Sequence, residues 1–158
     1  MGRSQLSAGR GRRVSERIKV AIHITNRQKT LPLDRRRMRT AILAILGDAE
    51  ISESEISVAV VDDPAIAELH GRFLDDPTPT DVLSFVLAQS PGRLEGEVIL
   101  SADTAAANAA KYHSTPAEEL LLYAIHGTLH LVGYDDITPA ARAVMRKREK
   151  EYLARTRP

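Results

Sequence analysis

The segment from Thr115 to Gly133 constrains the fold most, because it is typical of one buried helix with a marked start and a marked end. Thr115 can accept a hydrogen bond from a first-turn amide, Pro116 needs no donor at that position, and Glu118 can reach back to the cap. Gly133 favours a helix end. Apolar residues run through the segment at Leu120, Leu121, Ala124, Ile125, Leu129, Leu131 and Val132. We therefore expect the later part of this helix to lie inside the protein.

Two histidines on this helix indicate a metal site. His126 and His130 are four residues apart, so both imidazoles project from one face of the helix, about one turn apart. That spacing lets two ring nitrogens reach one ion at about 2.0–2.1 Å. Gly133 lets the chain turn back and bring Asp135 or Asp136 to the same ion. Three protein ligands with one open position are the arrangement of catalytic zinc.

A different interpretation of the same pair is two histidines with ordinary hydrogen bonds, and spacing alone leaves it open. The peptidase interpretation is disfavoured by one residue. Zinc peptidases of the His-Glu-x-x-His type carry their general base directly after the first histidine. Here that position is Gly127, which has no side chain to take a proton.

The rest of the chain predicts a small mixed sheet packed by helices. Strands are expected at residues 17–25, 56–61, 82–87 and 96–101, the last two as a hairpin around Pro91 and Gly92. Helices are expected from Asp34 to about residue 46, from an Asp63 cap onward, and over about 102–112 and 140–153. The fold class is therefore α+β, with about four strands, about five helices and the metal site at the end of a central helix.

Composition limits the function classes. The chain has no cysteine, which excludes disulfides and thiolate metal sites, and no apolar run approaches the roughly 20 residues that span a bilayer. We expect a cytoplasmic protein with no membrane partner. Residues 1–39 hold 12 of the 22 Lys and Arg but only Glu16 and Asp34 as acids, and this charge distribution favours a polyanionic partner such as RNA. Residues 1–14 are expected to be a flexible basic arm, and residues 15–158 a single metallohydrolase domain.

Two motifs resemble those of a known family. Residues 126–136, His-Gly-Thr-Leu-His-Leu-Val-Gly-Tyr-Asp-Asp, resemble the YbeY signature His-Gly-x-Leu-His-Leu-x-Gly-Tyr-Asp-His. Residues 79–85, Pro-Thr-Asp-Val-Leu-Ser-Phe, are similar to the family's second block, and residues 96–99 to its Gly-Asp-Ile-x-Ile strand. The similarity spans about residues 50–155. The resemblance implies a metal-dependent, single-strand-specific endoribonuclease, usually taken to hold zinc, that matures the 3′ end of small-subunit ribosomal RNA and serves ribosome quality control.

Three positions depart from the family pattern. The family's third metal histidine corresponds to Asp136, so the expected ligands are His126, His130 and Asp136, holding one Zn²⁺ or another divalent ion that suits a harder ligand. The family's arginine before the second block corresponds to Leu74, and Arg72 is two residues away.

The third departure is Glu97, where the family has aspartate. We expect Glu97 or Asp81 to act as base or to orient a ligand, and Arg72 to steady the phosphate. Substrate contacts are expected from Thr80, Ser84, Arg35 and Arg36, with single-stranded RNA and the small ribosomal subunit as partners. Two other functions stay open: a ribosome-assembly factor with weak or no catalysis, and a metal-dependent hydrolase of a substrate other than RNA.

Overall fold

The computed structural model describes residues 19–74 and 80–157, and their strands and helices follow the predicted order. The predicted basic arm, residues 1–14, lies outside these ranges. The strands are β1 (Lys19–Asn26), β2 (Glu53–Val61), β3 (Val82–Ser90) and β4 (Arg93–Ser101). The helices are α2 (Arg35–Asp48), α3 (Asp63–Leu74), α4 (Ala102–Lys111), α5 (Pro116–Leu131) and α6 (Pro139–Arg155). The α+β fold class is confirmed.

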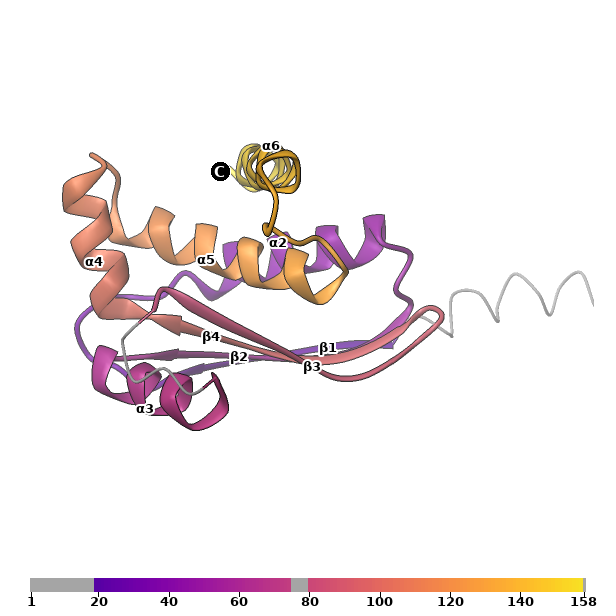
Figure 1. Cartoon of the computed structure of the whole chain (residues 1–158), viewed down its shortest axis with the longest axis horizontal. Helices are drawn as coiled ribbons and strands as arrows, with labels where there is room; N and C mark the ends of the chain where they lie inside the picture. The colour runs from indigo at the N-terminus through magenta and orange to yellow at the C-terminus, as the bar shows by residue number, and fades with distance from the viewer. Residues whose placement is uncertain (1–18, 75–79, 158) are drawn as a thin grey trace, which may run out of the picture.

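The four strands form one mixed sheet in the order β1-β2-β4-β3 (Figure 1). β1, β2 and β4 are parallel, and β3 pairs with β4 in the opposite direction. The predicted hairpin is confirmed, although both of its strands extend further toward Pro91 and Gly92 than expected.

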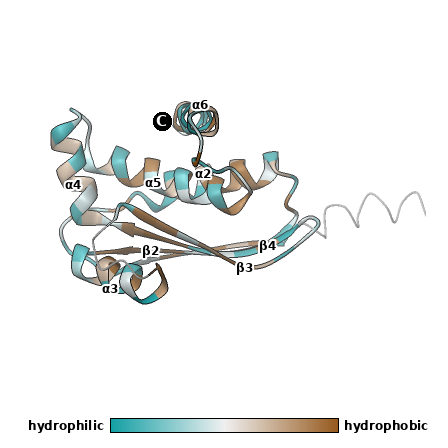
Figure 2. Cartoon of the chain, in the orientation of Figure 1, coloured by the Kyte–Doolittle hydropathy of each residue, from teal (hydrophilic) through white to brown (hydrophobic). Residues whose placement is uncertain are grey.

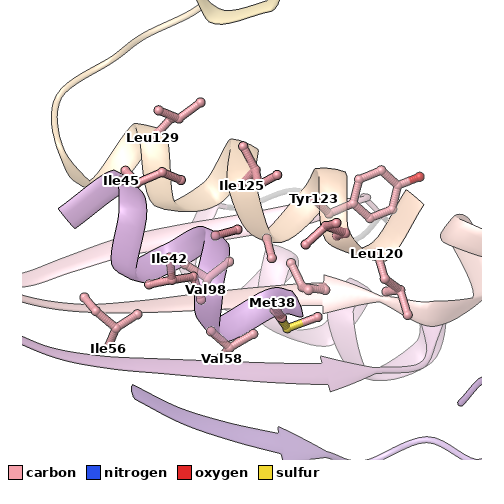
Figure 3. Packing of buried hydrophobic residues seen from close by; sticks show 14 of the residues in the cluster. Met38, Ile42, Ile45, Ile56, Val58, Val98, Leu120, Tyr123, Ile125 and Leu129 are labelled. Atoms are coloured by element: carbon pink, nitrogen blue, oxygen red, sulfur yellow. The ribbon is translucent and has the colours of Figure 1, made fainter. Parts of the chain in front are cut away.

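Helices cover both faces of the sheet, and the two faces differ in how much apolar surface they bury. α2 and α5 lie on one face, α3 lies on the other, and α6 crosses over the outer side of α2 and α5 (Figure 1). The large core lies between the sheet and α2 and α5, where Ile42, Val58 and Ile125 are fully buried (Figure 3). A small cluster of Val61, Ile66, Leu83 and Ile99 lies on the α3 face.

The hydropathy of the elements follows these layers. Strands β2 and β4 carry much apolar sequence, whereas α6 is mainly hydrophilic (Figure 2). α5 has the most buried residues of any described helix, as its sequence predicts. Within the described ranges, no helix is both long enough and apolar enough to span a membrane.

The helix caps are local features, and one of them differs from the prediction. Asp34, Thr115 and Thr138 each accept a hydrogen bond from a first-turn amide of the helix that follows. The sequence predicts Asp63 as the cap of α3. The amide of Ala65 instead donates to Asp62 Oδ1, at 2.9 Å, so Asp62 is the cap.

Candidate metal centre

The C-terminal end of α5 turns the chain back toward the two histidines. Gly133 has a positive φ of 110°, a conformation that a residue with a side chain rarely adopts. Its amide donates to the carbonyl of His130 at 3.1 Å, and the amide of Tyr134 donates to that of Leu129 at 3.0 Å. These two bonds form a Schellman motif. The turn reverses the chain, and Asp136 comes back beside α5.

Three donor atoms converge at this turn. The Nε2 atoms of His126 and His130 are 3.0 Å apart, and Asp136 Oδ2 lies 3.6 Å from the first and 3.5 Å from the second. A tetrahedral ion with ligands at about 2.0–2.1 Å holds them about 3.4 Å apart. The three atoms therefore fit three corners of one zinc-like coordination sphere. Asp135, the other candidate, accepts the amide of Ile137 through Oδ1.

Glu149 of α6 orients the first histidine, a role that the sequence did not predict. Its Oε2 lies 2.6 Å from His126 Nδ1, and its side chain is 15% exposed. When Nδ1 donates to this carboxylate, the free lone pair of the ring is on Nε2, which faces His130 and Asp136. A carboxylate behind a ligating histidine is the usual second layer of a zinc site.

The charges around His126 favour its protonated form when no ion is present. Burial of the ring lowers the pKa of His126, but the hydrogen bond that its Nδ1 donates to Glu149 and the charges of Glu149, Asp81 and Asp136 raise it, and the net direction is upward. A bound ion has to replace that proton, so metal binding at this site releases protons.

Close packing against the sheet fixes the side of α5 that carries Gly127. A Cβ at this position would lie 2.5 Å from Val98 Cγ1 and 3.0 Å from Ser84 Oγ. Ser84 Oγ also donates to the carbonyl of Gly127 at 3.0 Å. Position 127 therefore faces the sheet, whereas His126 and His130 face Asp136. The hydroxyl of Ser84, predicted to bind substrate, here joins α5 to β3.

A cavity of about 180 Å³ opens beside the donor atoms. His126, Asp136 and Glu149 line it, and Asp81, predicted as a base, lines it too. Asp81 Oδ1 accepts the amide of Val82 at 2.8 Å and the hydroxyl of Thr80 at 3.4 Å. These bonds position Asp81 at the start of β3. Its neighbour Thr80 does not line the cavity.

Glu97, the other predicted base, lies on the opposite face of the sheet. Successive residues of a strand point to opposite faces. Val98 packs against α5, so Glu97 faces the α3 side, where it is in register with Ser57 and Phe85. The structure therefore does not bring Glu97 together with the histidines.

The predicted arginines are also distant from the donor atoms. Arg72 lies on α3, and this helix covers the other face of the sheet (Figure 1). Arg72 pairs with Glu68 at 3.0 Å. Arg35 and Arg36 are exposed at the start of α2. The next residue, Arg37, pairs with Glu118 in the first turn of α5. The two histidines are centred about ten residues further along this helix, which corresponds to about 15 Å.

Glu149 left only a weak signal in the sequence. It lies four residues after Met145 on α6, and an apolar residue and an acid at that spacing share one helix face. Met145 is 1% exposed, so the face of α6 that carries Met145 and Glu149 points into the protein. Recognising the pair requires knowing which helix α6 packs on, which is tertiary information.

The fold and these donor atoms define a class: a small α+β protein with a candidate catalytic metal centre at the end of its central helix. Comparisons with known proteins agree. The sequence pattern of the family described as Endoribonuclease YbeY matches residues 23–157. The chain belongs to this family.

Relatives named Endoribonuclease YbeY match most of the chain. The Syntrophus aciditrophicus protein is 36% identical over 89% of this chain and 92% of its own length. The Moorella thermoacetica protein is 38% identical over 83% of this chain and 94% of its own. Among solved structures, the solution structure of TM1509 from Thermotoga maritima matches with a TM-score of 0.60 and 27% identity, over 85% of this chain and 88% of that one.

Proposed function

We propose that this chain is a cytoplasmic, metal-dependent endoribonuclease that cuts single-stranded RNA. We further propose that its substrate is ribosomal RNA in the small subunit, chiefly the 3′ end, and that it serves ribosome quality control. The observation that carries the proposal is the convergence of His126, His130 and Asp136 within 4.8 Å of one another. The family's name supports the choice of RNA as substrate.

The donor set suits one Zn²⁺ per chain. Imidazole nitrogen and carboxylate oxygen are both zinc ligands, and three of them leave a fourth position open for water or substrate. Asp136 is harder than the histidine of the family signature and adds a negative charge, so Mn²⁺ or another hard divalent ion is an alternative. When bound, a divalent ion at this site supplies Lewis acidity and a coordinated water of lowered pKa.

Residues of the chain itself supply positioning and proton transfer. Glu149 holds His126 in the tautomer that presents Nε2. Asp81 lines the cavity, and the hydrogen bonds that it accepts from Thr80 and Val82 both use Oδ1. Its Oδ2 can therefore take a proton from an attacking water. We propose no catalytic role for Glu97 or Arg72, because both lie on the α3 side of the sheet.

The remaining predicted residues contribute less directly. Arg35 and Arg36 can contact the backbone of a bound strand away from the cavity, since phosphate contacts carry most RNA affinity. Thr80 positions Asp81 through its hydroxyl. Ser84 fastens β3 to α5.

The test is a cleavage assay on single-stranded RNA with purified protein whose metal content is measured. His130→Ala is expected to lose both the ion and cleavage. Full activity in a metal-free His130→Ala protein would refute a metal mechanism. Asp136→His is expected to retain the ion, and unchanged affinity and unchanged ion preference would show that Asp136 is not a ligand.

A matched pair of carboxylate variants tests the choice of base. Asp81→Asn and Glu97→Gln each remove one negative charge with little change in volume. We expect Asp81→Asn to reduce kcat by about 10²–10⁴-fold and Glu97→Gln to leave it nearly unchanged. The reverse order would contradict the assignment. Ribosome association without cleavage would favour an assembly factor, and cleavage of small esters but not RNA would favour another hydrolase.

A further inference from the structure

The cavity beside the donor atoms is lined on one side by a stripe of α6. The stripe consists of residues spaced i, i+3, i+4 and i+7, which share one face of a helix. They are Arg142, Met145, Arg146 and Glu149. Met145 is buried and Glu149 bonds His126, so these two residues fix how α6 is rotated. That rotation brings both arginines to the cavity.

The two arginines differ in what they contact. Arg142 Nη1 donates to the carbonyls of Asp136, at 3.2 Å, and Ile137, at 3.0 Å, so it holds the loop that carries the third donor. Arg146 is exposed and makes no hydrogen bond or ion pair with any residue in 19–74 or 80–157. Its guanidinium is therefore available to a ligand in the cavity.

The cavity needs positively charged side chains such as Arg146 if it is to bind the phosphate backbone of RNA. Asp81, Asp136 and Glu149 contribute three negative charges, and a divalent ion offsets two of them. The remaining negative charge would repel a phosphodiester, which is itself an anion. The positive charges of Arg142 and Arg146 make the net charge of the cavity positive. Arg72, the predicted phosphate ligand, cannot do so, because it lies on the opposite face of the sheet and pairs with Glu68.

The size of the cavity indicates which part of RNA it takes. Pockets that enclose a drug-sized ligand measure about 300–1,000 Å³. At about 180 Å³, this cavity suits a phosphate group on a strand that passes across it, and not an enclosed nucleotide.

We propose that Arg146 binds a phosphate of the RNA substrate beside the His126–His130–Asp136 group. The inference rests on the proposed function. Arg146 touches substrate, and its planar guanidinium gives two parallel hydrogen bonds to phosphate oxygens, which a lysine ammonium cannot reproduce. Arg142 is a positioning residue, because it acts through the loop of Asp136.

The experiment compares Arg146→Gln with Lys147→Gln in the full-length, metal-loaded protein. Both variants remove one positive charge from an exposed position of α6, but Lys147 does not line the cavity. Binding is measured by fluorescence anisotropy with a labelled single-stranded RNA at several salt concentrations, with Asp81→Asn added to every protein compared so that the strand is cut only slowly. Metal content and the midpoint of thermal unfolding are measured for each variant.

We expect Arg146→Gln to weaken binding by about tenfold or more, as the loss of a charged hydrogen bond does. The slope of log K against log salt should fall by about 0.7, the value for one phosphate contact on a single strand. Lys147→Gln should change affinity less than about twofold. Arg146→Lys should recover the salt slope but only part of the affinity.

Equal affinities and salt slopes for Arg146→Gln and Lys147→Gln would overturn the proposal. The proposed endoribonuclease function is tested separately with the wild-type protein. It fails if metal-loaded wild-type protein neither binds nor cuts single-stranded RNA. A wild-type protein that cuts RNA, together with an Arg146→Gln variant of unchanged KM, refutes the Arg146 assignment alone.

Discussion

Replacing Gly127 by alanine tests whether packing against the sheet fixes the histidine helix. The new Cβ would lie 2.5 Å from Val98 Cγ1 and 3.0 Å from Val82 Cγ2. Carbon atoms in contact are normally about 3.5–4.0 Å apart. Val98 is fully buried on an internal strand, and its branched side chain has few rotamers, so it cannot simply move aside. The helix must therefore shift away from the sheet.

Two opposing terms set the size of the effect. Overpacking of a core costs about 1–3 kcal/mol, and the contact with Val98 places this site at the upper end. Alanine is better than glycine inside a helix by about 0.8–1.0 kcal/mol. The expected net loss for Gly127→Ala is about 2 kcal/mol. For a chain of this size, that lowers Tm by about 4–8 °C.

Gly47 offers a matched control on α2. It is also helical, but a Cβ there would meet nothing within 4 Å. Only the propensity term applies, so Gly47→Ala should gain up to about 1 kcal/mol and raise Tm by about 2–4 °C. Thermal and urea unfolding of both variants, with metal removed by chelator, measures the two effects with opposite signs.

The reasoning fails if Gly127→Ala is as stable as Gly47→Ala. A double variant adds a second criterion. Val98→Ala removes the atom that the new Cβ meets, so combining it with Gly127→Ala should be less destabilising than the sum of the two by about 1 kcal/mol or more. Additive effects would show that the contact with Val98 is not the cause.

Further expectations concern α6. Glu149→Gln keeps a bond to His126 but removes the charge behind it, so competition with a chelating dye should show about 10–100-fold weaker metal binding. Tyr152→Phe removes the hydroxyl that donates to Asp48 at 2.7 Å, and urea unfolding should show a loss of about 1 kcal/mol. The hydrogen bonds from Arg155 and Tyr152 lower the pKa of Asp48 below its ordinary value. The ionised Asp48 carboxylate therefore stabilises the fold at pH values above its ordinary pKa. That stability is lost as the pH falls through the lower pKa of the folded state, so Asp48→Asn should flatten the acid limb of the curve of stability against pH.

The order of elements could be predicted because the signals that set it are local. Thr115 and Pro116 start α5 wherever that helix packs, and Gly133 ends it with bonds to its own last turn. The i, i+4 spacing of His126 and His130 depends only on helix geometry. The loop of Asp136 follows directly from the turn, so the three donor atoms could be predicted together.

The roles of residues on other elements could not be predicted, because they depend on which face of the sheet α5 covers. Glu97 is one residue away from Val98, and that single step places it on the α3 side. Arg72 is close to Asp81 in sequence but lies on a helix beneath the sheet. Glu149 and Arg146 reach the site only because Met145 fixes the rotation of α6.

The small buried surface of α6 affects how firmly Glu149 is held beside the candidate metal site. Of its 17 residues, α6 buries Met145 and Tyr152, whereas α5 is buried along most of its length. Segments with few buried contacts open at a lower free energy than the whole protein unfolds. Local opening of α6 would separate Glu149 from His126 and remove one wall of the cavity, while the sheet and α5 stay folded. The contact between Glu149 and His126 therefore depends on the local stability of α6, and a highly stable core would not by itself keep that carboxylate in place.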